Sequence, residues 1–394
     1  MQIAGVIAEY NPFHNGHAWQ LAELRRRGAE RVVVALSCGA VQRGELPLLP
    51  EPVRVRAALE AGADLVLAIP APAACSGAAQ FAAAGVRVLA AAGCDTLACG
   101  TETLTPAECM AAAAALESEA CTAALKAQLA GPARSFAAAR QAALATVAPA
   151  LAARLQNPND NLAVEYARAI RAQAAPLTLV TLPRVGAGHH DAAPGGAFAS
   201  AGWLRARWAQ GGAAALAGYV PEAALALYRN VEQEGAALAP ERFSAALLAQ
   251  LRLRLGQQEH PFGEVRGVRE GLDRGLEKAV RRSSEAQQLY DGMTTVRYPR
   301  ARVRRLALDA ALGYTAALNA PVPYLQVLGA RRDALPLLSR AALPADTSLA
   351  RLARHSAACA VFAAAQARAA DLGALCRSTP GPMGEAYTRP CVLL

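Results

Sequence analysis

Two histidines near the N-terminus, His14 and His17, have the spacing of side chains that act together. Residues three apart lie on one side of a helix, so both imidazoles share a side if a helix starts here. The first turn of a helix has unpaired N–H groups and the positive end of the helix dipole, which favour an anion. Two imidazoles there can donate hydrogen bonds to phosphate oxygens as charge develops in a transition state. The alternative interpretation is that one histidine caps the helix and the other packs.

The residues around the histidines predict a strand, a loop and a helix, in that order. Residues 3–8 (IAGVIA) form an uninterrupted apolar run, which is typical of a parallel strand buried on both faces. Pro12 disfavours helical geometry in the residue before it, and Gly16 lets the backbone come close to a ligand. Apolar residues then recur at helical spacing in residues 18–22. The histidine pair is therefore expected where the first strand leads into the first helix.

Strands and helices alternate through the first half of the chain. Apolar runs predict further strands at residues 31–37, 64–69, 96–99 and 177–182, with helices at 51–61 and 77–92. This alternation indicates an α/β fold with a Rossmann-like, doubly wound parallel sheet. Ligands of such sheets bind at the carboxyl ends of the strands. The loop after the first strand, the Gln42-Arg43-Gly44 loop and Gly100 all follow strands, so we expect one cleft to collect them.

The rest of the chain is predicted to be mainly helical. Residues 105–155 are Ala-rich, and the turn-rich residues 157–161 (NPNDN) are expected to cap a helix over 162–171. Another helix is expected to start at Ser200, and the pattern is helical beyond about residue 210. We predict a catalytic domain over residues 1–210 and a mainly helical, basic C-terminal domain over 211–394.

A family resemblance rests on the first loop and on later motifs. Residues 11–17 (NPFHNGH) resemble the signature of the HxGH nucleotidyltransferase superfamily, and residues 9–17 (EYNPFHNGH) are similar to one member family, the bacterial tRNA(Met) cytidine acetate ligases. The later motifs, in the family's order, are Gln42-Arg43-Gly44-Glu45, Gly62-Ala63-Asp64-Leu65-Val66, Gly100-Thr101-Glu102, Pro158-Asn159-Asp160, Glu165-Tyr166, Arg184, His190-Asp191, Ser200-Ala201, Arg205, Glu270-Gly271-Leu272, Arg297-Tyr298, Arg302 and Arg305. Gly202, Pro299 and Ala301 depart from the family pattern, and Gly202 stands where the family usually has Thr.

The resemblance implies an ATP site and a two-step acyl transfer. The implied ATP contacts are Ile7, Ala8, Glu9, Tyr10, Asn11, Pro12, Phe13, His14, Asn15, Gly16, His17, Ala18, Trp19, Gln20, Gly100, Asn159 and Arg184. His14 and His17 are the expected catalytic residues, Mg²⁺ is expected to accompany ATP, and no protein metal site is expected. Acetate, with Gln42 or Arg43 as its candidate contact, would become acetyl-adenylate. The acetyl group would then pass to the wobble cytidine of elongator tRNA(Met), giving N4-acetylcytidine. Without the family, Gly100 is a turn glycine, Asn159 a helix cap and Arg184 a surface charge.

The positive charge of the chain is carried almost entirely by arginine. The net charge is +9, and the only lysines are Lys126 and Lys278. Residues 265–305 are strongly basic and are expected to bind the phosphates of tRNA. The expected tRNA contacts are Arg281, Arg282, Arg297, Arg302 and Arg305. A solvated helix face is the alternative for this region.

Two other functions stay open at the level of the residues. A nucleotidyltransferase acting on a small phosphorylated metabolite would keep the histidine pair but would not need the basic region. A non-catalytic RNA-binding protein would keep the arginines and tolerate the loss of His17.

Composition predicts a globular cytoplasmic protein with no membrane partner. The chain is 54% hydrophobic and 18% charged, and it shows neither a signal sequence nor an apolar run of about 18 residues. Nine cysteines are scattered without a C-x-x-C pair, which indicates reduced thiols rather than disulfides or a zinc site. No feature of the sequence indicates an oligomeric state.

Overall fold

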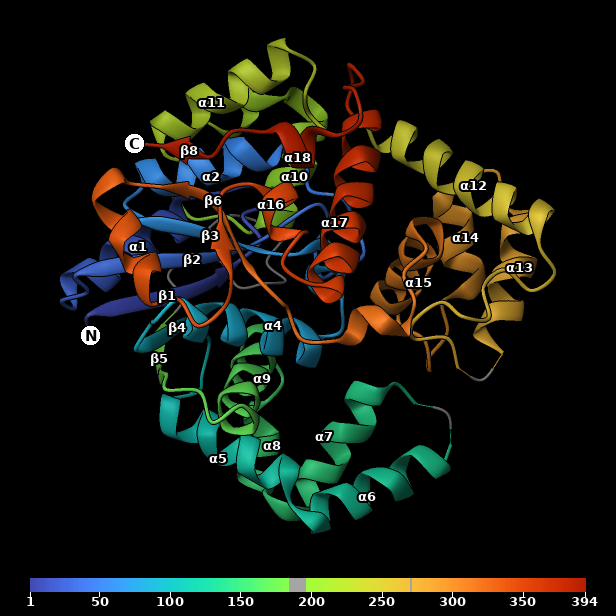
Figure 1. Ribbon diagram of the computed structural model, residues 1–394. Coiled ribbons are helices and arrows are strands. Elements are labelled where there is room, and N and C mark those ends of the chain that lie inside the picture. The colour runs from blue at the N-terminus through green and yellow to red at the C-terminus, as the bar shows by residue number, and fades with distance from the viewer. Residues whose placement is uncertain (133, 184–195, 270) are drawn as a thin grey trace.

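The computed structural model describes residues 1–394 except 133, 184–195 and 270 (Figure 1). The strands are β1 (Ile3–Ala8), β2 (Arg31–Ser37), β3 (Leu65–Ile69), β4 (Thr96–Thr101), β5 (Thr178–Pro183), β6 (Leu325–Ala330), β7 (Ala345–Asp346) and β8 (Val392–Leu393). Within the described residues these strands form one sheet in the order β5-β4-β1-β2-β3-β6-β7, with β8 beside β6.

The first five strands are parallel, as the sequence predicts. β1 pairs with both β2 and β4, and the outer pairs β2–β3 and β4–β5 are parallel too. The chain moves outward from β1 in one direction through β2 and β3, and then in the other direction through β4 and β5. A ligand crevice is expected outside the carboxyl ends of the strands where the order reverses, which here lies between β1 and β4.

The helices that follow the strands are also close to their predicted positions. The α-helices are α1 (Asn15–Arg26), α2 (Glu51–Glu60), α3 (Ala71–Ala74), α4 (Ala78–Ala91), α5 (Pro106–Glu117), α6 (Glu119–Ala130), α7 (Phe136–Val147), α8 (Pro149–Arg154), α9 (Pro158–Ala172), α10 (Ala201–Gly211), α11 (Glu222–Gln233), α12 (Pro240–Gln257), α13 (Leu272–Arg282), α14 (Ala286–Met293), α15 (Arg300–Leu312), α16 (Leu349–Leu352), α17 (Ala357–Leu375) and α18 (Glu385–Thr388). Short 3₁₀ helices are η1 (Ala213–Leu216), η2 (Ala316–Asn319) and η3 (Arg332–Arg340).

Two apolar clusters cover the two faces of the sheet. On β2, Val33 and Ala35 contribute to one cluster while Val32 and Val34 contribute to the other, because successive side chains of a strand point to opposite faces. α4, α5 and α9 complete the first cluster, and α1, α2, α10 and α11 complete the second (Figure 1). A strand buried on both faces explains the uninterrupted apolar runs in the sequence.

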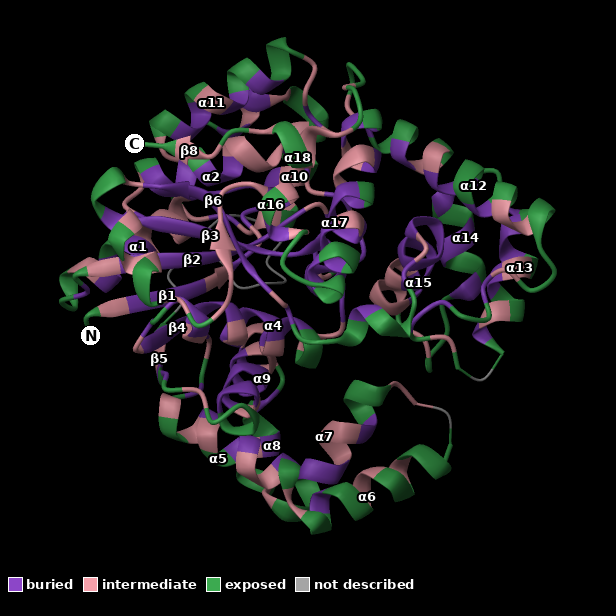
Figure 2. Ribbon diagram, in the orientation of Figure 1, coloured by how far each residue is buried: buried purple, intermediate pink, exposed green. Residues whose placement is uncertain are grey.

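A third apolar cluster forms the core of a helical lobe made of α12 to α15 and α17 (Figure 1). Phe262, Tyr314 and Phe362 are among its fully buried side chains. Ala40 and Ala71, from the first half of the chain, belong to the same cluster. The lobe therefore packs directly on the loop after β2 and on α3, while much of the outer surface of α12 to α14 is exposed (Figure 2).

Helices dominate beyond residue 210, as predicted, but the prediction omits three strands there. β6 joins the sheet antiparallel to β3, and β7 and β8 pair with β6. All six residues of β6 (LQVLGA) are buried, and a short apolar run of this kind cannot be distinguished from a buried helical turn by its periodicity. The division at residue 210 stays a prediction, although both proposed parts contribute strands to the sheet.

One helix start differs from the prediction. α9 begins at Pro158, so residues 158–161 form its first turn instead of a capping loop before it. Asn157 is the N-cap residue, and its side chain makes no capping hydrogen bond within this fully described segment. Pro at the first helical position is favourable because its missing N–H would be unpaired there anyway.

The structure describes all nine cysteines, and each is a free thiol. None of the described helices combines the length and the apolar character needed to cross a membrane.

Candidate active site

His14 and His17 together cap the N-terminus of α1. The Nδ1 atom of His14 accepts a hydrogen bond from the backbone N–H of Gly16 at 3.1 Å. The Nδ1 atom of His17 accepts a hydrogen bond from the backbone N–H of His14 at 3.3 Å. Because each Nδ1 is an acceptor, the proton of each neutral imidazole lies on Nε2. Both histidines therefore cap the helix through Nδ1, whereas the alternative interpretation expects one to cap and the other to pack. The Nε2–H groups are the donors suited to a phosphate.

The two imidazole rings are stacked at the positive end of α1. Their centroids lie 3.7 Å apart and their planes make an angle of 25°. The first turn of α1, which the structure describes in full, contains no acidic residue. The helix dipole is therefore not offset locally, and the helix start favours an anion.

Aromatic packing fixes the loop that presents the histidines. The ring of Tyr10 packs edge-on against His17 and against Phe13, at centroid distances of 4.7 and 4.8 Å. The hydroxyl of Tyr228 donates to the backbone carbonyl of Phe13 at 2.7 Å. Asn15 donates through Nδ2 to one carbonyl before α10 and to another after η1, both at 2.9 Å. Packing that holds a side chain in one orientation is what a catalytic group needs.

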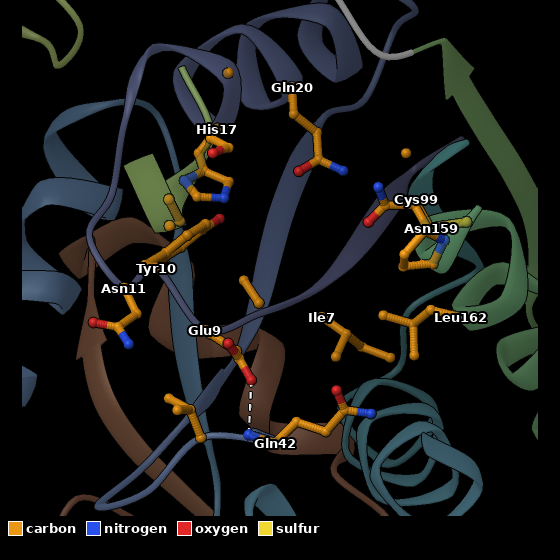
Figure 3. Close-up of a pocket in the computed structure, with 18 of the residues that line it drawn as sticks. Ile7, Glu9, Tyr10, Asn11, His17, Gln20, Gln42, Cys99, Asn159 and Leu162 are labelled. Carbon is orange, nitrogen blue, oxygen red and sulfur yellow. Dashed lines mark hydrogen bonds between the residues drawn. The ribbon is translucent and has the colours of Figure 1, made fainter. Parts of the chain in front are cut away.

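The carboxylate of Glu9 lies on the other side of the same loop. It accepts a hydrogen bond from the backbone N–H of Gln42 at 2.8 Å (Figure 3). Burial raises the pKa of Glu9, while the Gln42 hydrogen bond and the charges of Arg43 and Arg205 act in the opposite direction. An ionisable group with such opposing influences, placed in a cleft, is typical of functional sites.

Arg54 clamps the ends of the two central strands. It is fully buried, and its Nη1 donates to the backbone carbonyls of Glu9 at 2.8 Å and Ser37 at 2.9 Å. Burial lowers the pKa of Arg54. These hydrogen bonds tie the carboxyl end of β1 to that of β2, and so they position the loop that carries Glu9.

Gly100 and Asn159 approach the site from β4 and α9. Asn159 lies in the first turn of α9 and donates through Nδ2 to the carboxylate of Glu102. Asp160 accepts a hydrogen bond from the backbone N–H of Glu102 at 2.9 Å. The start of α9 is thereby joined to the end of β4, which explains why residues so far apart in sequence meet at one site.

The two histidines share one cavity of about 380 Å³ with Glu9, Gly100 and Asn159, and this size is typical of small-molecule sites. The predicted ATP contacts that line it are Ile7, Ala8, Glu9, Tyr10, Asn11, His14, Gly16, His17, Trp19, Gln20, Gly100 and Asn159. Of the other predicted contacts that the structure describes, Pro12, Phe13, Asn15 and Ala18 are not among the lining residues. Arg184, with His190 and Asp191, lies outside the described residues, as does Glu270.

The cavity has an apolar wall and a polar wall. Ile7 and Leu162 lie near Asn159 and away from His17 (Figure 3). Gln42 and Arg43, the candidate acetate contacts, also line the cavity. The expectation that the first loop, the Gln42-Arg43-Gly44 loop and Gly100 meet in one cleft is confirmed.

Two arginines that line the cavity are absent from the predicted site. Arg205 of α10 donates through Nη1 to the backbone carbonyl of Asn11 at 2.8 Å, and burial lowers its pKa. Arg140 of α7 pairs with the buried Glu165, and burial lowers the pKa of Arg140 to about 10. A signal for Arg205 exists, because it follows the helix start that Ser200 caps. Arg140 offers none, since an Ala-rich helix does not reveal which residue reaches α9.

The basic region has a different character. Arg281, Arg282 and Arg297 are exposed, and Arg302 lies over the ring of Tyr298 at 5.0 Å. Arg305 is half-buried and donates to the backbone carbonyl of Gln42 at 2.9 Å. Arg305 therefore contacts the loop that lines the cavity, whereas the other four lie further along the lobe.

The comparisons with known proteins agree with this geometry. The sequence model of the family described as HIGH Nucleotidyl Transferase matches residues 1–378, so fold and site define a nucleotidyltransferase of this class. Proteins named tRNA(Met) cytidine acetate ligase are 32% identical in Listeria welshimeri, over 86% of each chain, and 33% identical in Syntrophotalea carbinolica, over 89% of this chain and 86% of that one. The chain belongs to the tRNA(Met) cytidine acetate ligase family, which confirms the resemblance seen in the sequence.

Solved structures confirm the fold over the whole chain. A crystal structure of Thermotoga maritima TmcAL bound with alpha-thio ATP has a TM-score of 0.90 at 23% identity, covering 100% of both chains. The apo form of the same protein has a TM-score of 0.92, also at 23% identity and 100% coverage of both chains.

Proposed function

We propose that the protein is an ATP-dependent acetate ligase that acetylates the wobble cytidine of elongator tRNA(Met). The observation that carries the proposal is the pair of stacked imidazoles at the start of α1, opening on a cavity between β1 and β4. Membership of a family whose relatives bear that name supports the same activity. ATP as the nucleotide agrees with the alpha-thio ATP bound to Thermotoga maritima TmcAL.

The first step joins acetate to AMP. A carboxylate oxygen of acetate attacks the α-phosphorus of ATP, and the bond to the bridging oxygen breaks as pyrophosphate leaves with the electron pair. His14 and His17 donate through Nε2–H to phosphate oxygens, and the α1 start adds its N–H groups. Arg43 and Arg205, which also line the cavity, offset the charge of the phosphates or of acetate. Positioning and electrostatics carry most of the rate enhancement in such a transfer.

Mg²⁺ accompanies ATP in this proposal. Among the described residues, no group of three or more His, Cys, Asp or Glu is placed to hold a metal. Mg²⁺ usually needs only one or two protein carboxylates, because phosphate oxygens and water supply the remaining ligands. The carboxylates of Glu9 and Glu45 line the cavity and suit that role.

The second step transfers the acetyl group to RNA. The exocyclic amine of cytidine attacks the acetyl carbonyl carbon, the bond to AMP breaks, and the nitrogen loses a proton. The tRNA is held by the arginines of residues 265–305 through its phosphates. We expect the reaction to take place in the cytoplasm, a reducing compartment that suits nine free thiols.

Acetate-dependent ATP–pyrophosphate exchange, followed by mass spectrometry of nucleosides from treated tRNA(Met), tests the proposal. We expect exchange only with acetate, and N4-acetylcytidine only with enzyme, ATP and acetate together. Exchange without acetylcytidine would favour a nucleotidyltransferase acting on a small phosphorylated metabolite. Neither exchange nor acetylcytidine would favour a non-catalytic RNA-binding protein.

A further inference from the structure

A second cavity, of about 580 Å³, lies in the helical lobe between α13 and α14. We call it the lobe cavity and define it by Gly275, Lys278 and Arg282 of α13, Gln288 and Gly292 of α14, and Tyr298. Its volume is within the range of small-molecule sites. We call the cavity beside His14 and His17 the reaction cavity. The lobe cavity is separate from it, because the two share no lining residue among those described.

Glycines keep the lobe cavity open. A Cβ atom at Gly275 would meet only Met293 Cε, at 3.8 Å, and a Cβ atom at Gly292 would meet nothing within 4 Å. Glycine in the interior of a helix is destabilising relative to alanine. Both helices therefore carry an unfavourable residue where its missing side chain leaves space between them.

The rim of the lobe cavity is cationic. Lys278 and Arg282 are one turn apart on the same side of α13, and both are exposed. No carboxylate among the described residues lies within ion-pair distance of either side chain, whereas Arg274 pairs with Glu277 in the same helix. The rim therefore presents two positive charges to solvent.

The floor of the lobe cavity is apolar. Leu272, Ala279 and Met293 are buried at its base. Gln288 accepts hydrogen bonds at Oε1 from the backbone N–H and the hydroxyl of Ser284, so Nε2 is its donor group. An apolar slot with an amide and two cations at its edge matches an unpaired nucleotide, with the base inside and phosphates on the cations. Paired RNA keeps its bases stacked and cannot place one in such a slot.

Contacts connect the lobe cavity to the reaction cavity. Tyr298 lines the lobe cavity, and Arg302 lies over its ring at 5.0 Å. Arg305, one turn later in α15, donates to the backbone carbonyl of Gln42, which lines the reaction cavity. The start of α15 therefore lies between the two cavities and contacts a residue of each.

We propose that the lobe cavity binds an unpaired nucleotide of the same RNA whose target cytidine enters the reaction cavity. The identity of that RNA rests on the proposed function. The existence of a single-stranded nucleotide site does not, because it is argued from the lobe cavity itself.

The test fills the lobe cavity. Gly292→Met places a side chain in open space, and Gly256→Met is the matched control because Gly256 is also helical, exposed and without neighbours within 4 Å of a Cβ atom. The probes are a synthetic RNA hairpin with an unpaired loop and a fully paired duplex of the same stem, measured by fluorescence anisotropy. We expect Gly292→Met to weaken hairpin binding by about 5- to 150-fold, the value of one stacked base, and to leave duplex binding unchanged.

The two lysines of the chain provide a second comparison. The affinity falls as salt rises, and Lys278→Gln should make this dependence shallower: the magnitude of the slope of log hairpin affinity against log salt should decrease by about 0.7. Lys126→Gln should leave the slope unchanged. Hairpin affinities of Gly292→Met and Gly256→Met that both equal the wild-type value would overturn the proposal, as would a wild-type protein that prefers the duplex. Acetate-dependent exchange needs no RNA, so we expect it to be unchanged in Gly292→Met. Its absence from the wild-type protein would instead refute the proposed function.

Discussion

The reaction cavity and the helical lobe use positive charge in opposite ways. Arg205, which lines the cavity, and Arg54, which clamps the ends of β1 and β2, are held by hydrogen bonds to backbone carbonyls, and burial lowers the pKa of both. In the lobe, Arg281 and Arg282 are exposed to solvent. A reacting group needs one geometry, whereas a polyanion can be gripped by flexible cations in many geometries.

The difference predicts how each region responds to mutation. A single change in the cavity should produce a large effect on turnover, because the side chains there are fixed by one another. Removal of a single exposed charge from the lobe should produce only a small effect on RNA affinity. The following predictions test this contrast, from the largest expected effect to the smallest.

Arg266 is the arginine of the lobe that should break the contrast. It is buried, forms two hydrogen bonds with Asp309 at 2.8 and 2.7 Å, and also donates to the carbonyl of Cys75 at 2.6 Å. Arg266→Met leaves a buried carboxylate without its partner, so we expect unfolding to become easier by about 3–5 kcal/mol. Urea denaturation followed by circular dichroism measures this, with the exposed Arg269→Met as control. Equal stabilities of the two variants would contradict the structural role of Arg266.

The histidine pair can be separated from its capping role. Asn is a favoured N-cap residue and Gln is a favoured partner three residues later, so His14→Asn and His17→Gln retain the capping box. Each variant loses the imidazole that carries the Nε2–H donor, and we expect acetate-dependent exchange to fall about 100- to 1,000-fold. The exposed His355→Ala serves as control and should keep full activity. Variants with normal exchange would show that the imidazoles serve only as caps.

Glu9 should make the stability of the folded protein depend on pH. Burial raises the pKa of Glu9 above 4.5, so its ionised form costs stability. The cost is absent below about pH 4.5, grows as the pH rises towards the raised pKa, and is complete above it. Glu9→Gln keeps an acceptor for the N–H of Gln42 and removes the charge. We therefore expect the variant to melt at a higher temperature than wild type near neutral pH.

The difference between Glu9→Gln and wild type should shrink as the pH falls through the pKa of Glu9. Thermal denaturation of both proteins over a pH series measures it. A difference that stays constant, or that grows on acidification, would contradict the assigned direction.

The smallest effects are expected on the exposed lobe. Arg281→Ala and Arg282→Ala should each decrease the magnitude of the slope of log tRNA affinity against log salt by about 0.7–0.9. Arg305→Ala should change the slope less, because Arg305 is half-buried against the carbonyl of Gln42. Filter binding over a salt series measures the three slopes. If Arg305→Ala decreased the magnitude of the slope by as much as Arg281→Ala does, Arg305 would be a phosphate contact after all.

The sequence predicts the parallel sheet and much of the cavity because their signals are local. β1 and β2 have the predicted bounds, since strands buried on both faces are read directly as apolar runs. β6 is missed because it pairs with β3 across a long stretch of chain and no local signal marks that pairing. Arg54 and Arg140 are missed for a related reason: their roles depend on tertiary contacts with strand ends and with α9.

The central claim is that the start of α1 holds the triphosphate of ATP. A crystal structure with a non-hydrolysable ATP analogue tests it most directly. The account predicts phosphate oxygens within hydrogen-bonding distance of the Nε2 atoms of His14 and His17. An analogue bound elsewhere, with both imidazoles engaged only in packing and capping, would contradict it.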